Sequence, residues 1–328
     1  SGNLVWQKTF GGEGDDVAFS IQQTIDNGYI VAGISYSFNG NVSGNHGGGD
    51  YWVIKLDTAG NLVWQKSFGG SKEDKANSVR QTSDGGYIVA GRSKSNDGDV
   101  SGNHGKDDAW IIRLDTDGNL QWQKSFGGSS DDMANSVMQT IEGGYIVAGG
   151  TASKNGDVLG NYDNGDCWII KLDTNGNLQW QKPLGGSEED NSNSIQQTVD
   201  GGFVIAGWSA SIDGDVSVNH GDVDYWIVKL AADTFTAIQS ISNISISLYP
   251  NPVQNELTIR MTSLEGEITI SVYDLQGKMI ELPTTLLGEF EQNRQAQINT
   301  AALANGFYTL QITNKNGLSE VLKFVKQE

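Results

Sequence analysis

The sequence predicts an all-β chain: a β-propeller of four 58-residue, four-stranded blades closed by the N-terminal strand, followed by a small antiparallel β-sandwich. The main observation is that two series of tryptophans recur every 58 residues: Trp6, Trp64, Trp122 and Trp180, and Trp52, Trp110, Trp168 and Trp226. A period in this range is typical of propellers, solenoids and arrays of small units. From about residue 243 the composition changes and the period stops, which predicts a separate second domain.

Each repeat is expected to form four short strands. In the second repeat they are residues 78–82, 85–91, 109–115 and 120–126, rich in β-branched and aromatic residues and bounded by Gly, Asp and Asn. No helical periodicity interrupts them. Residues 115–119 predict a hairpin turn with glycine at the left-handed position. Four strands per repeat indicate a propeller blade, whereas solenoid coils of this length would more often contain a helix.

The fourth repeat contains only three of these strands, ending with residues 225–230. The missing outer strand has the same sequence pattern as residues 4–10, "LVWQKTF", which open the chain. We therefore expect residues 4–10 to pair with residues 225–230, because a ring closed in this way leaves no open edge. Further residues before Ser1 would open the ring or change the number of blades.

Domain boundaries follow from the repeat: a propeller over residues 1–232, a linker over 233–245 and the sandwich over 246–328. The chain holds 40 acidic and 21 basic residues, a net charge of −19. Residues 240–328 hold 9 acids and 6 bases, so 16 of the net negative charges belong to the repeats. The resulting negative electrostatic field disfavours binding to nucleic acid and anionic membranes and favours binding of cations or neutral polymers. The single Cys167 excludes an intramolecular disulfide.

One face of the propeller is expected to bind a ligand. The loop before the first strand of a blade and the loop between its second and third strands emerge on the same face. The first of these loops carries an acidic pair in every repeat: Asp15/Asp16, Glu73/Asp74, Asp131/Asp132 and Glu189/Asp190. Candidate ligand residues are therefore Asp16, Asp74, Asp132 and Asp190. Paired carboxylates are also an ingredient of glycosidases, but a fourfold recurrence is equally what a structural cap would show.

Trp208 is a further candidate on this face. Its equivalents in the other repeats are Ile34, Arg92 and Gly150, so the repeat does not need an aromatic residue there. An aromatic ring beside a polar loop could stack on a sugar, or it could be an incidental substitution.

The loop "DGDVSGNHGKDD" matches part of the calcium-loop pattern. Asp97, Asp99 and Ser101 take the first, third and fifth positions, and Asp108 takes the twelfth. Alternating short oxygen ligands let a loop wrap one hard cation. The fourth repeat offers Asp213, Asp215 and Asp224. The alternative is a long loop held by Asx turns, with Asp108 fixing the start of the next strand. Calcium is the only cofactor that the sequence suggests.

The last 80-odd residues contain alternating strands over residues 247–259, 268–280 and 298–312, which predict a small antiparallel sandwich. This segment closely resembles the type A C-terminal sorting domain of the type IX secretion system of Bacteroidota. Leu303 accompanies the main matching residues, which are Tyr249, Pro250, Asn251, Pro252, Leu257, Asp274, Gly277, Lys278, Gly306, Tyr308 and Lys323.

The resemblance implies a protein that is secreted or held at the cell surface of a Gram-negative bacterium. Its implied partners are the type IX translocon, an outer-membrane shuttle barrel and a sortase that removes the domain. We then expect the propeller to be a non-enzymatic binding protein for an extracellular glycan or protein. The alternatives are a secreted glycan-degrading hydrolase and a structural surface spacer.

Overall fold

The computed structural model describes residues 2–162, 164–232, 245–262, 268–274, 278–290, 293–314 and 319–327. These residues form 23 β-strands and no helix, which confirms the all-β prediction. None of them belongs to a helix that could span a membrane. The chain divides into two compact units, Ser1–Asp233 and Thr234–Glu328. Residues 233–244 of the expected linker lie outside the described residues.

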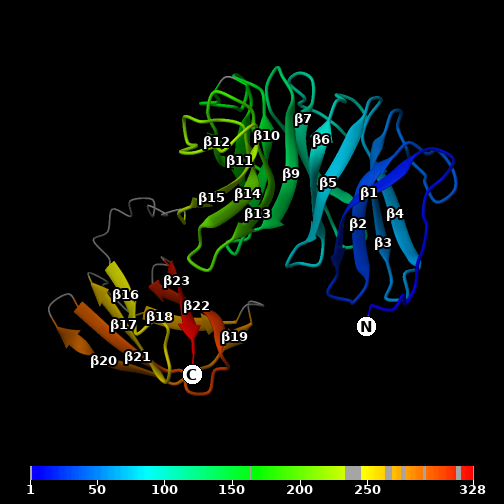
Figure 1. Cartoon of the computed structure of the whole chain (residues 1–328). Helices are drawn as coiled ribbons and strands as arrows, with labels where there is room; N and C mark the ends of the chain where they lie inside the picture. Colours follow the sequence, from blue (N-terminus) through cyan, green and yellow to red (C-terminus); the bar gives the residue numbers. More distant parts are fainter. Residues whose placement is uncertain are drawn as a thin grey trace. The chain divides into compact units, whose positions relative to one another are not determined.

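The first unit is a row of four antiparallel sheets whose strands follow chain order (Figure 1). Sheet 1 contains β1 (Asp16–Gln23), β2 (Tyr29–Ser35), β3 (Asp50–Leu56) and β4 (Leu62–Phe68). Sheet 2 contains β5 (Asp74–Gln81), β6 (Tyr87–Ser93), β7 (Asp108–Leu114) and β8 (Leu120–Phe126). Sheet 3 contains β9 (Asp132–Gln139), β10 (Tyr145–Thr151), β11 (Asp166–Leu172) and β12 (Leu178–Leu184). Sheet 4 contains only β13 (Asp190–Gln197), β14 (Phe203–Ser209) and β15 (Asp224–Leu230).

The third strand of each complete sheet is buried along its whole length. In β7, "DAWIIRL", Ala109 and Ile111 face the following sheet, whereas Trp110 and Ile112 face the preceding one. A continuous apolar run of this length is what a strand covered on both faces requires. The hairpin to the fourth strand closes through a glycine with φ near +76°, as at Gly118 (φ 77°), a conformation that other residues rarely adopt.

Adjacent sheets pack face to face, and the same positions recur at each junction. We call the side of a sheet that packs on the following sheet its forward face, and the opposite side its rear face. At the first junction, Tyr51 of the forward face packs on Trp110, with ring centroids 4.5 Å apart, and its hydroxyl donates to the Trp110 carbonyl at 2.8 Å. The forward faces of sheets 1 to 3 are formed by Ile30, Ala32, Tyr51 and Val53; Ile88, Ala90, Ala109 and Ile111; and Ile146, Ala148, Cys167 and Ile169.

Cys167 is therefore a packing residue of the third junction. Its side chain is fully buried, and burial raises the pKa of its thiol to about 12. A neutral, inaccessible thiol of this kind is chemically inert.

The outer strand of each sheet also holds the next sheet. The Trp64 ring of β4 meets Tyr87 of sheet 2 edge-on at 5.7 Å, and Trp122 meets Tyr145 of sheet 3 in the same way. Trp6 meets Tyr29 of sheet 1 at the same 5.7 Å, although residues 2–10 form no strand. The N-terminal segment thus occupies, on sheet 1, the place that an outer strand occupies on every later sheet.

The predicted pairing of residues 4–10 with residues 225–230 is not present in this structure. Strand β15 is hydrogen-bonded only to β14 among the described strands. Sheets 1 and 4 lie at opposite ends of the row (Figure 1), so a segment fixed on Tyr29 does not reach β15. The four-strand repeat units are confirmed, whereas closure into a four-bladed propeller is not.

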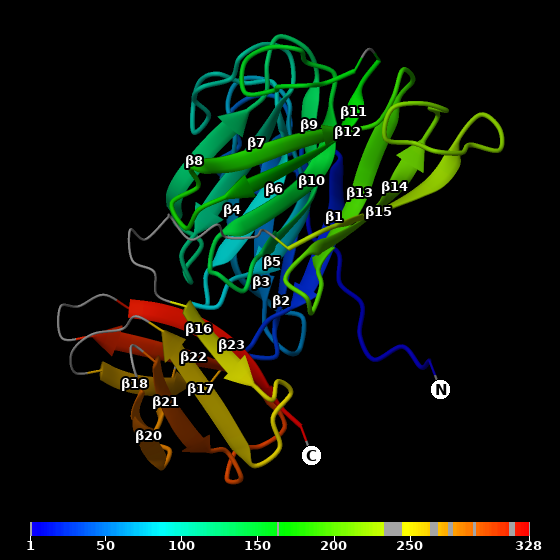
Figure 2. The ribbon, with the colours of Figure 1, turned by 90° about the vertical axis from the view of Figure 1, so that its left-hand side faces the viewer.

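The second unit consists of two four-stranded sheets (Figure 2). One has the order β16 (Ser245–Tyr249), β17 (Glu256–Thr262), β21 (Asn293–Asn299) and β20 (Thr284–Phe290). The other has the order β19 (Met279–Ile280), β18 (Ile268–Tyr273), β22 (Gly306–Asn314) and β23 (Ser319–Lys326). Both sheets contribute to one hydrophobic core that includes Leu257, Ile259, Val272, Leu310 and Phe324, as in a β-sandwich.

Replacing Ile111 by alanine should lower the free energy of unfolding of the repeat unit by about 2–5 kcal/mol, because a fully buried isoleucine leaves a cavity. The matched control is Ile212→Ala, whose side chain is 73% exposed and which should change stability by less than about 0.5 kcal/mol. Urea unfolding followed by tryptophan fluorescence measures both. Equal effects of the two substitutions would contradict the junction packing described above.

Candidate functional site

In the second unit, the segment that follows β16 is bound to the last strand of the chain. The side-chain oxygen of Asn251 accepts a hydrogen bond from the Val325 amide at 2.9 Å, and its amide group donates to the Lys323 carbonyl at 3.3 Å. The Val253 amide donates to the Val325 carbonyl at 2.7 Å, and the Gln327 amide donates to the Val253 carbonyl at 2.9 Å. The two ends of the unit are thus joined backbone to backbone.

The other residues of the sorting motif have distinct structural roles. Leu257, Leu303 and Tyr308 belong to the core, and Tyr308 stacks on Phe324 at 5.5 Å. The Asp274 carboxylate accepts a hydrogen bond from the Lys278 amide at 2.9 Å. Gly306 begins β22 opposite Lys326. Gly277 lies outside the described residues.

Tyr249 is the last residue of β16 and is partly exposed. Its hydroxyl accepts a hydrogen bond from Gln295 at 2.8 Å, and the Arg260 guanidinium lies 5.9 Å from the centre of its ring. Pro250 and Pro252 follow in cis peptide bonds.

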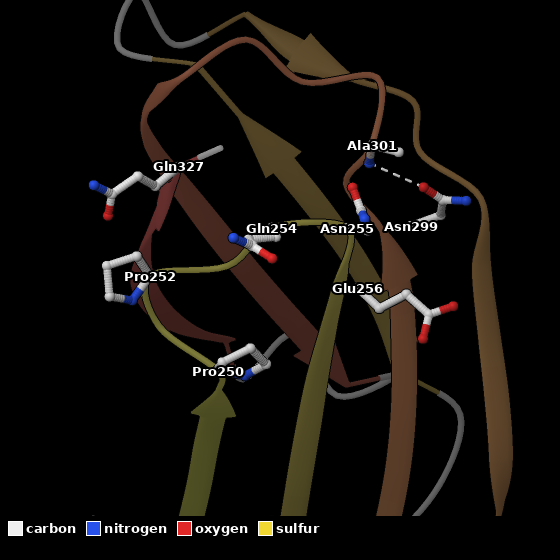
Figure 3. A pocket seen from close by; sticks show the side chains of 8 residues that line it. All are labelled: Pro250, Pro252, Gln254, Asn255, Glu256, Asn299, Ala301 and Gln327. Atoms are coloured by element: carbon white, nitrogen blue, oxygen red, sulfur yellow. Dashed lines mark hydrogen bonds between the residues drawn. The ribbon is translucent and has the colours of Figure 1, made fainter.

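A cleft of about 810 Å³ opens beside this segment. Its lining comes from the β16–β17 connection and the start of β17, from the end of β21 and the loop after it, and from the residue after β23 (Figure 3): Pro250, Pro252, Gln254, Asn255, Glu256, Asn299, Ala301 and Gln327. The Ala301 amide donates to the Asn299 side chain at 2.9 Å, which fixes the loop after β21. Sequence reasoning identified the two prolines but missed the rest, because only the fold brings residues 254–256, 299–301 and 327 together.

In the first unit, the candidate loops lie at one end of the strands, because neighbouring strands are antiparallel. We call this the loop face: residues 11–15, 69–73, 127–131 and 185–189 before the first strands, and 36–49, 94–107, 152–162 with 164–165, and 210–223 between second and third strands. The predicted acidic residues lie here, but the two members of each acidic pair have different environments.

The second acid of each pair lies beneath the loop face. Asp74 is fully buried, and its carboxylate accepts hydrogen bonds from Ser93, from Ser95 at 2.9 Å and from the Gly70 amide at 2.8 Å. Asp16, Asp132 and Asp190 accept equivalent bonds from the corresponding serine and glycine residues. Each of these four aspartates therefore links the loop before the first strand of its sheet to the loop after the second strand.

The first acid of each pair is on the surface. Asp15 and Glu189 are exposed, and Asp131 is half-buried near Lys106, whose Nζ is 3.4 Å away. Glu73 accepts a hydrogen bond from the Tyr36 hydroxyl of sheet 1 at 2.6 Å and pairs with Arg92 at 3.0 Å. The Glu73 carboxylate raises the pKa of Tyr36 to about 12. Ion pairs and hydrogen bonds thus connect neighbouring loops across the junctions.

The oxygens of the predicted calcium loop do not converge on one point. Asp97 accepts the Ser71 amide at 2.8 Å, Asp99 accepts the Gly69 amide at 3.3 Å, and Asp108 accepts the His104 amide at 2.9 Å. The Ser101 hydroxyl accepts the Gln123 side chain at 2.5 Å. In sheet 4, Asp213, Asp215 and Asp224 make the same bonds to Ser187, Gly185 and His220. Within the described part of the chain, no three acidic, histidine or cysteine side chains are placed to hold a metal.

The structure also brings two of the predicted aspartates, Asp74 and Asp190, each beside a second aspartate that the sequence analysis did not single out. Asp50, at the start of β3, and Asp74, at the start of β5, face each other across Gly69 of the first junction. A Cβ atom on Gly69 would lie 2.7 Å from Asp50 Oδ1 and 2.6 Å from Asp74 Oδ2. Asp166 and Asp190 face each other across Gly185 in the same way. The recurrence of aspartate at the first position of every third strand was the signal that could have revealed them.

Burial raises the pKa of Asp50 and of Asp166 to about 6. The neighbouring aspartate adds to this effect, because a second negative charge disfavours ionisation. The folded state thus favours protonation of Asp50 and Asp166 more than the unfolded state does.

Trp208 does not stand alone beside the loop. It lies directly opposite Tyr225 in the β14–β15 register, and directly opposite residues share one face of a sheet. Trp208 is half-buried on the forward face of sheet 4, together with Tyr225, which is 96% exposed.

The raised pKa values predict how stability depends on pH. A group whose folded pKa exceeds its unfolded value stabilises the fold below the unfolded value, near 3.8, and this stabilisation is lost as pH rises through about 6. Asp50→Asn, which imitates the protonated acid, should therefore raise the free energy of unfolding at pH 7.5 by about 1–2 kcal/mol and change it little at pH 4.

The control for this prediction is Asp115→Asn. Hydrogen bonds from Asn119 lower the pKa of Asp115, so this substitution should lower stability at pH 7.5. Unfolding curves at pH 4, 6 and 7.5 test both directions. An Asp50→Asn variant that is destabilised equally at all three pH values would contradict the prediction.

Comparison with known proteins assigns the second unit. Residues 247–327 match the family model described as the secretion system C-terminal sorting domain. Regulatory protein FlaEY of Caulobacter vibrioides is 27% identical over 223 residues, which are 63% of this chain. This chain spans only 23% of the length of that curated relative.

Two solved structures align with most of the chain at low similarity. Dimeric latent PorU from Porphyromonas gingivalis covers 94% of this chain and 33% of its own, with 11% identity and a TM-score of 0.23. Surface layer protein SbsC, domains 1–6, covers 94% of this chain and 53% of its own, with 11% identity and a TM-score of 0.18. Scores this low carry no argument about the fold.

The sorting motif, the sandwich that contains it and the family match over residues 247–327 agree. These residues belong to the type IX secretion C-terminal sorting domains, and the chain that carries them is a secreted or cell-surface protein of a Gram-negative bacterium.

Proposed function

We propose that the first unit is a propeller-type, non-enzymatic binding protein, which the second unit carries out of the cell through the type IX translocon. The sorting domain implies interaction with the type IX machinery. An outer-membrane shuttle barrel would bind the second unit, and a sortase would then remove it.

The observation that supports recognition of the second unit is the cleft beside Pro250 and Pro252. Its walls combine prolines with amide and carboxylate side chains from three separate segments, and the last strand is fixed beside it by the Asn251 and Val253 bonds. A partner reading this cleft would therefore read a folded domain rather than a linear peptide.

The loop face supports a binding role for the first unit. The second acid of each pair is held by a hydrogen bond from a serine side chain, which leaves the first acid of the pair as the more exposed one. A hydrolase of the two-carboxylate kind needs both members accessible to its substrate. Exposed acids on loops held together by cross-junction bonds suit a neutral or cationic glycan or protein.

Fusion of residues 240–328 to a periplasmic reporter should bring the reporter to the surface of a type IX-competent bacterium. Removing residues 323–328 should leave it in the periplasm, because the truncation deletes the partners of Asn251 and Val253. Surface protease sensitivity measures the distribution.

A second pair of variants separates recognition from folding. Gln254→Arg with Glu256→Arg changes exposed cleft residues and should block display while the circular dichroism spectrum stays unchanged. Phe307→Ala, an exposed position outside the cleft, should be displayed normally. Full display of the double-arginine variant would exclude the cleft as the recognition surface.

The full-length protein should bind members of an array of extracellular glycans or surface proteins without releasing reducing sugars. Combined replacement of Asp15, Asp131 and Glu189 by the corresponding amides should weaken binding at least tenfold, whereas Asp117→Asn, in the turn at the other end of the β7 and β8 strands, should not. Sugar release that one such substitution abolishes would favour a hydrolase. Absence of both binding and release would leave a structural spacer.

The same preparation tests calcium. Binding of Ca²⁺ would require the loop from Asp97 to Asp108 to rearrange so that its oxygen ligands surround one ion. Such binding would give heat in titration calorimetry and raise the melting temperature. The hydrogen bonds of Asp97, Asp99 and Asp108 to separate amides predict no such response.

A further inference from the structure

The forward face of sheet 4 and the rear face of sheet 1 are the two halves of a junction that the described residues of the first unit do not complete. We propose that a second copy of this chain completes it. The forward face of sheet 4 in each copy packs on the rear face of sheet 1 in the other, giving a closed ring of eight sheets.

The forward face of sheet 4 has the residues of an interior junction, but no described strand of the first unit packs on it. By the 58-residue repeat, Val204, Ala206, Tyr225 and Ile227 correspond to Ile30, Ala32, Tyr51 and Val53 of sheet 1. Tyr51 and Val53 are fully buried against sheet 2, whereas Tyr225 is 96% and Ile227 63% exposed. Trp208 extends this apolar surface, since it lies opposite Tyr225.

The rear face of sheet 1 has room for such a surface. A hollow of about 360 Å³ lies against it, lined by Ala18, Ile21, Val31, Trp52, Ile54 and the Trp6 ring. In sheet 2 the equivalent side chains, among them Val79, Val89, Trp110 and Ile112, are covered by the forward face of sheet 1. The hollow therefore corresponds to the space that Tyr51 and Val53 fill at the junction between sheets 1 and 2.

The N-terminal segment fits the same arrangement. It is docked on sheet 1 as an outer strand of a preceding sheet would be, through Trp6 on Tyr29 and through Lys8 Nζ, 3.4 Å from Asn61 Oδ1. Lys66 approaches Asn119 in the same way at the next junction. Among the described strands, none pairs with the outer edge of β15 in sheet 4. Residues 4–10 of one copy would add to β15 of the other as its fourth strand.

The register of this added strand follows from the complete sheets. Trp64 lies opposite Lys55, and Gln65 opposite Ile54, in the β3–β4 pair. The same offsets recur in β7–β8 and β11–β12. Trp6 of one copy would therefore lie opposite Lys229, and Gln7 opposite Val228, of the other.

We expect two copies, because this number forms a closed ring of sheets. A contact between different faces of identical chains forms a ring if the rotation closes and an open filament if it does not. Two rows of four sheets give eight, which is within the usual range of about four to eight blades in a propeller, whereas three rows exceed it. Closure of a single chain would require sheets 1 and 4 to meet, and they lie at opposite ends of the row (Figure 1).

The full-length chain should show, by light scattering after size exclusion, twice its mass of 35.3 kDa. Tyr225→Glu with Ile227→Glu should weaken dimerisation at least about 100-fold and give the monomer mass at micromolar concentration. The matched control is Val199→Glu with Ile212→Glu, two exposed apolar loop residues (90% and 73%), which should leave the dimer intact. A wild-type chain that stays monomeric up to about 100 μM would overturn the proposal.

Single cysteines test the exchanged strand directly. Residues directly opposite in an antiparallel pair are within disulfide reach, and native Cys167 is buried and will not interfere. A mixture of Gln7→Cys and Val228→Cys chains should, on oxidation, give a covalent dimer on a non-reducing gel. A mixture of Gln7→Cys with Val199→Cys should not. If the doubly substituted chain, Gln7→Cys with Val228→Cys, instead cross-links within itself as a monomer, the ring closes in one chain and the second copy is excluded.

Discussion

The architecture of the first unit depends on one constraint: each sheet has two apolar faces and can bury them only against neighbouring sheets. The third strands show this most clearly, since β3, β7 and β11 are buried from end to end. No sheet could satisfy this pattern alone, and stability accumulates through nearest-neighbour junctions, as in other repeat proteins. Where the row ends, the same residues are left in water, as Tyr225 shows when compared with Tyr51.

The same junctions determine the electrostatics of the loop face. A strand that starts with aspartate places its carboxylate at the rim of the apolar junction, and Gly69 or Gly185 leaves space for a second one. Hydrogen bonds from serines and amides hold one aspartate of each pair, as at Asp74 and Asp190. Its partner is left favouring the protonated form at mildly acidic pH. Much of the formal charge near this face is therefore structural, and the charge that a ligand could meet is carried by fewer residues, such as Asp15 and Glu189.

Features that depend on local pattern could be predicted from the sequence, and features that depend on three-dimensional curvature could not. The 58-residue period gave the four strands of each repeat, and the motif from Tyr249 to Lys323 gave the sorting domain. Ring closure by residues 4–10 depends on the angle between successive sheets, which side-chain packing sets and no periodicity records. The pattern around Asp97 resembled a calcium loop because Asx-type bonds to amides and calcium coordination favour the same short oxygen-bearing residues. The cleft beside Pro250 combines residues 250–256, 299–301 and 327, which only the fold brings together.

The bonds between Asn251, Val253 and the final strand have a consequence for biosynthesis. They connect residues that are made near the beginning and at the very end of the domain, 74 positions apart for Asn251 and Val325. The domain can therefore assume this shape only after its last strand, β23, has been synthesised. A polypeptide that stopped before residue 323 would leave Asn251 and Val253 without these partners, so the folded domain itself reports that its last strand has been made.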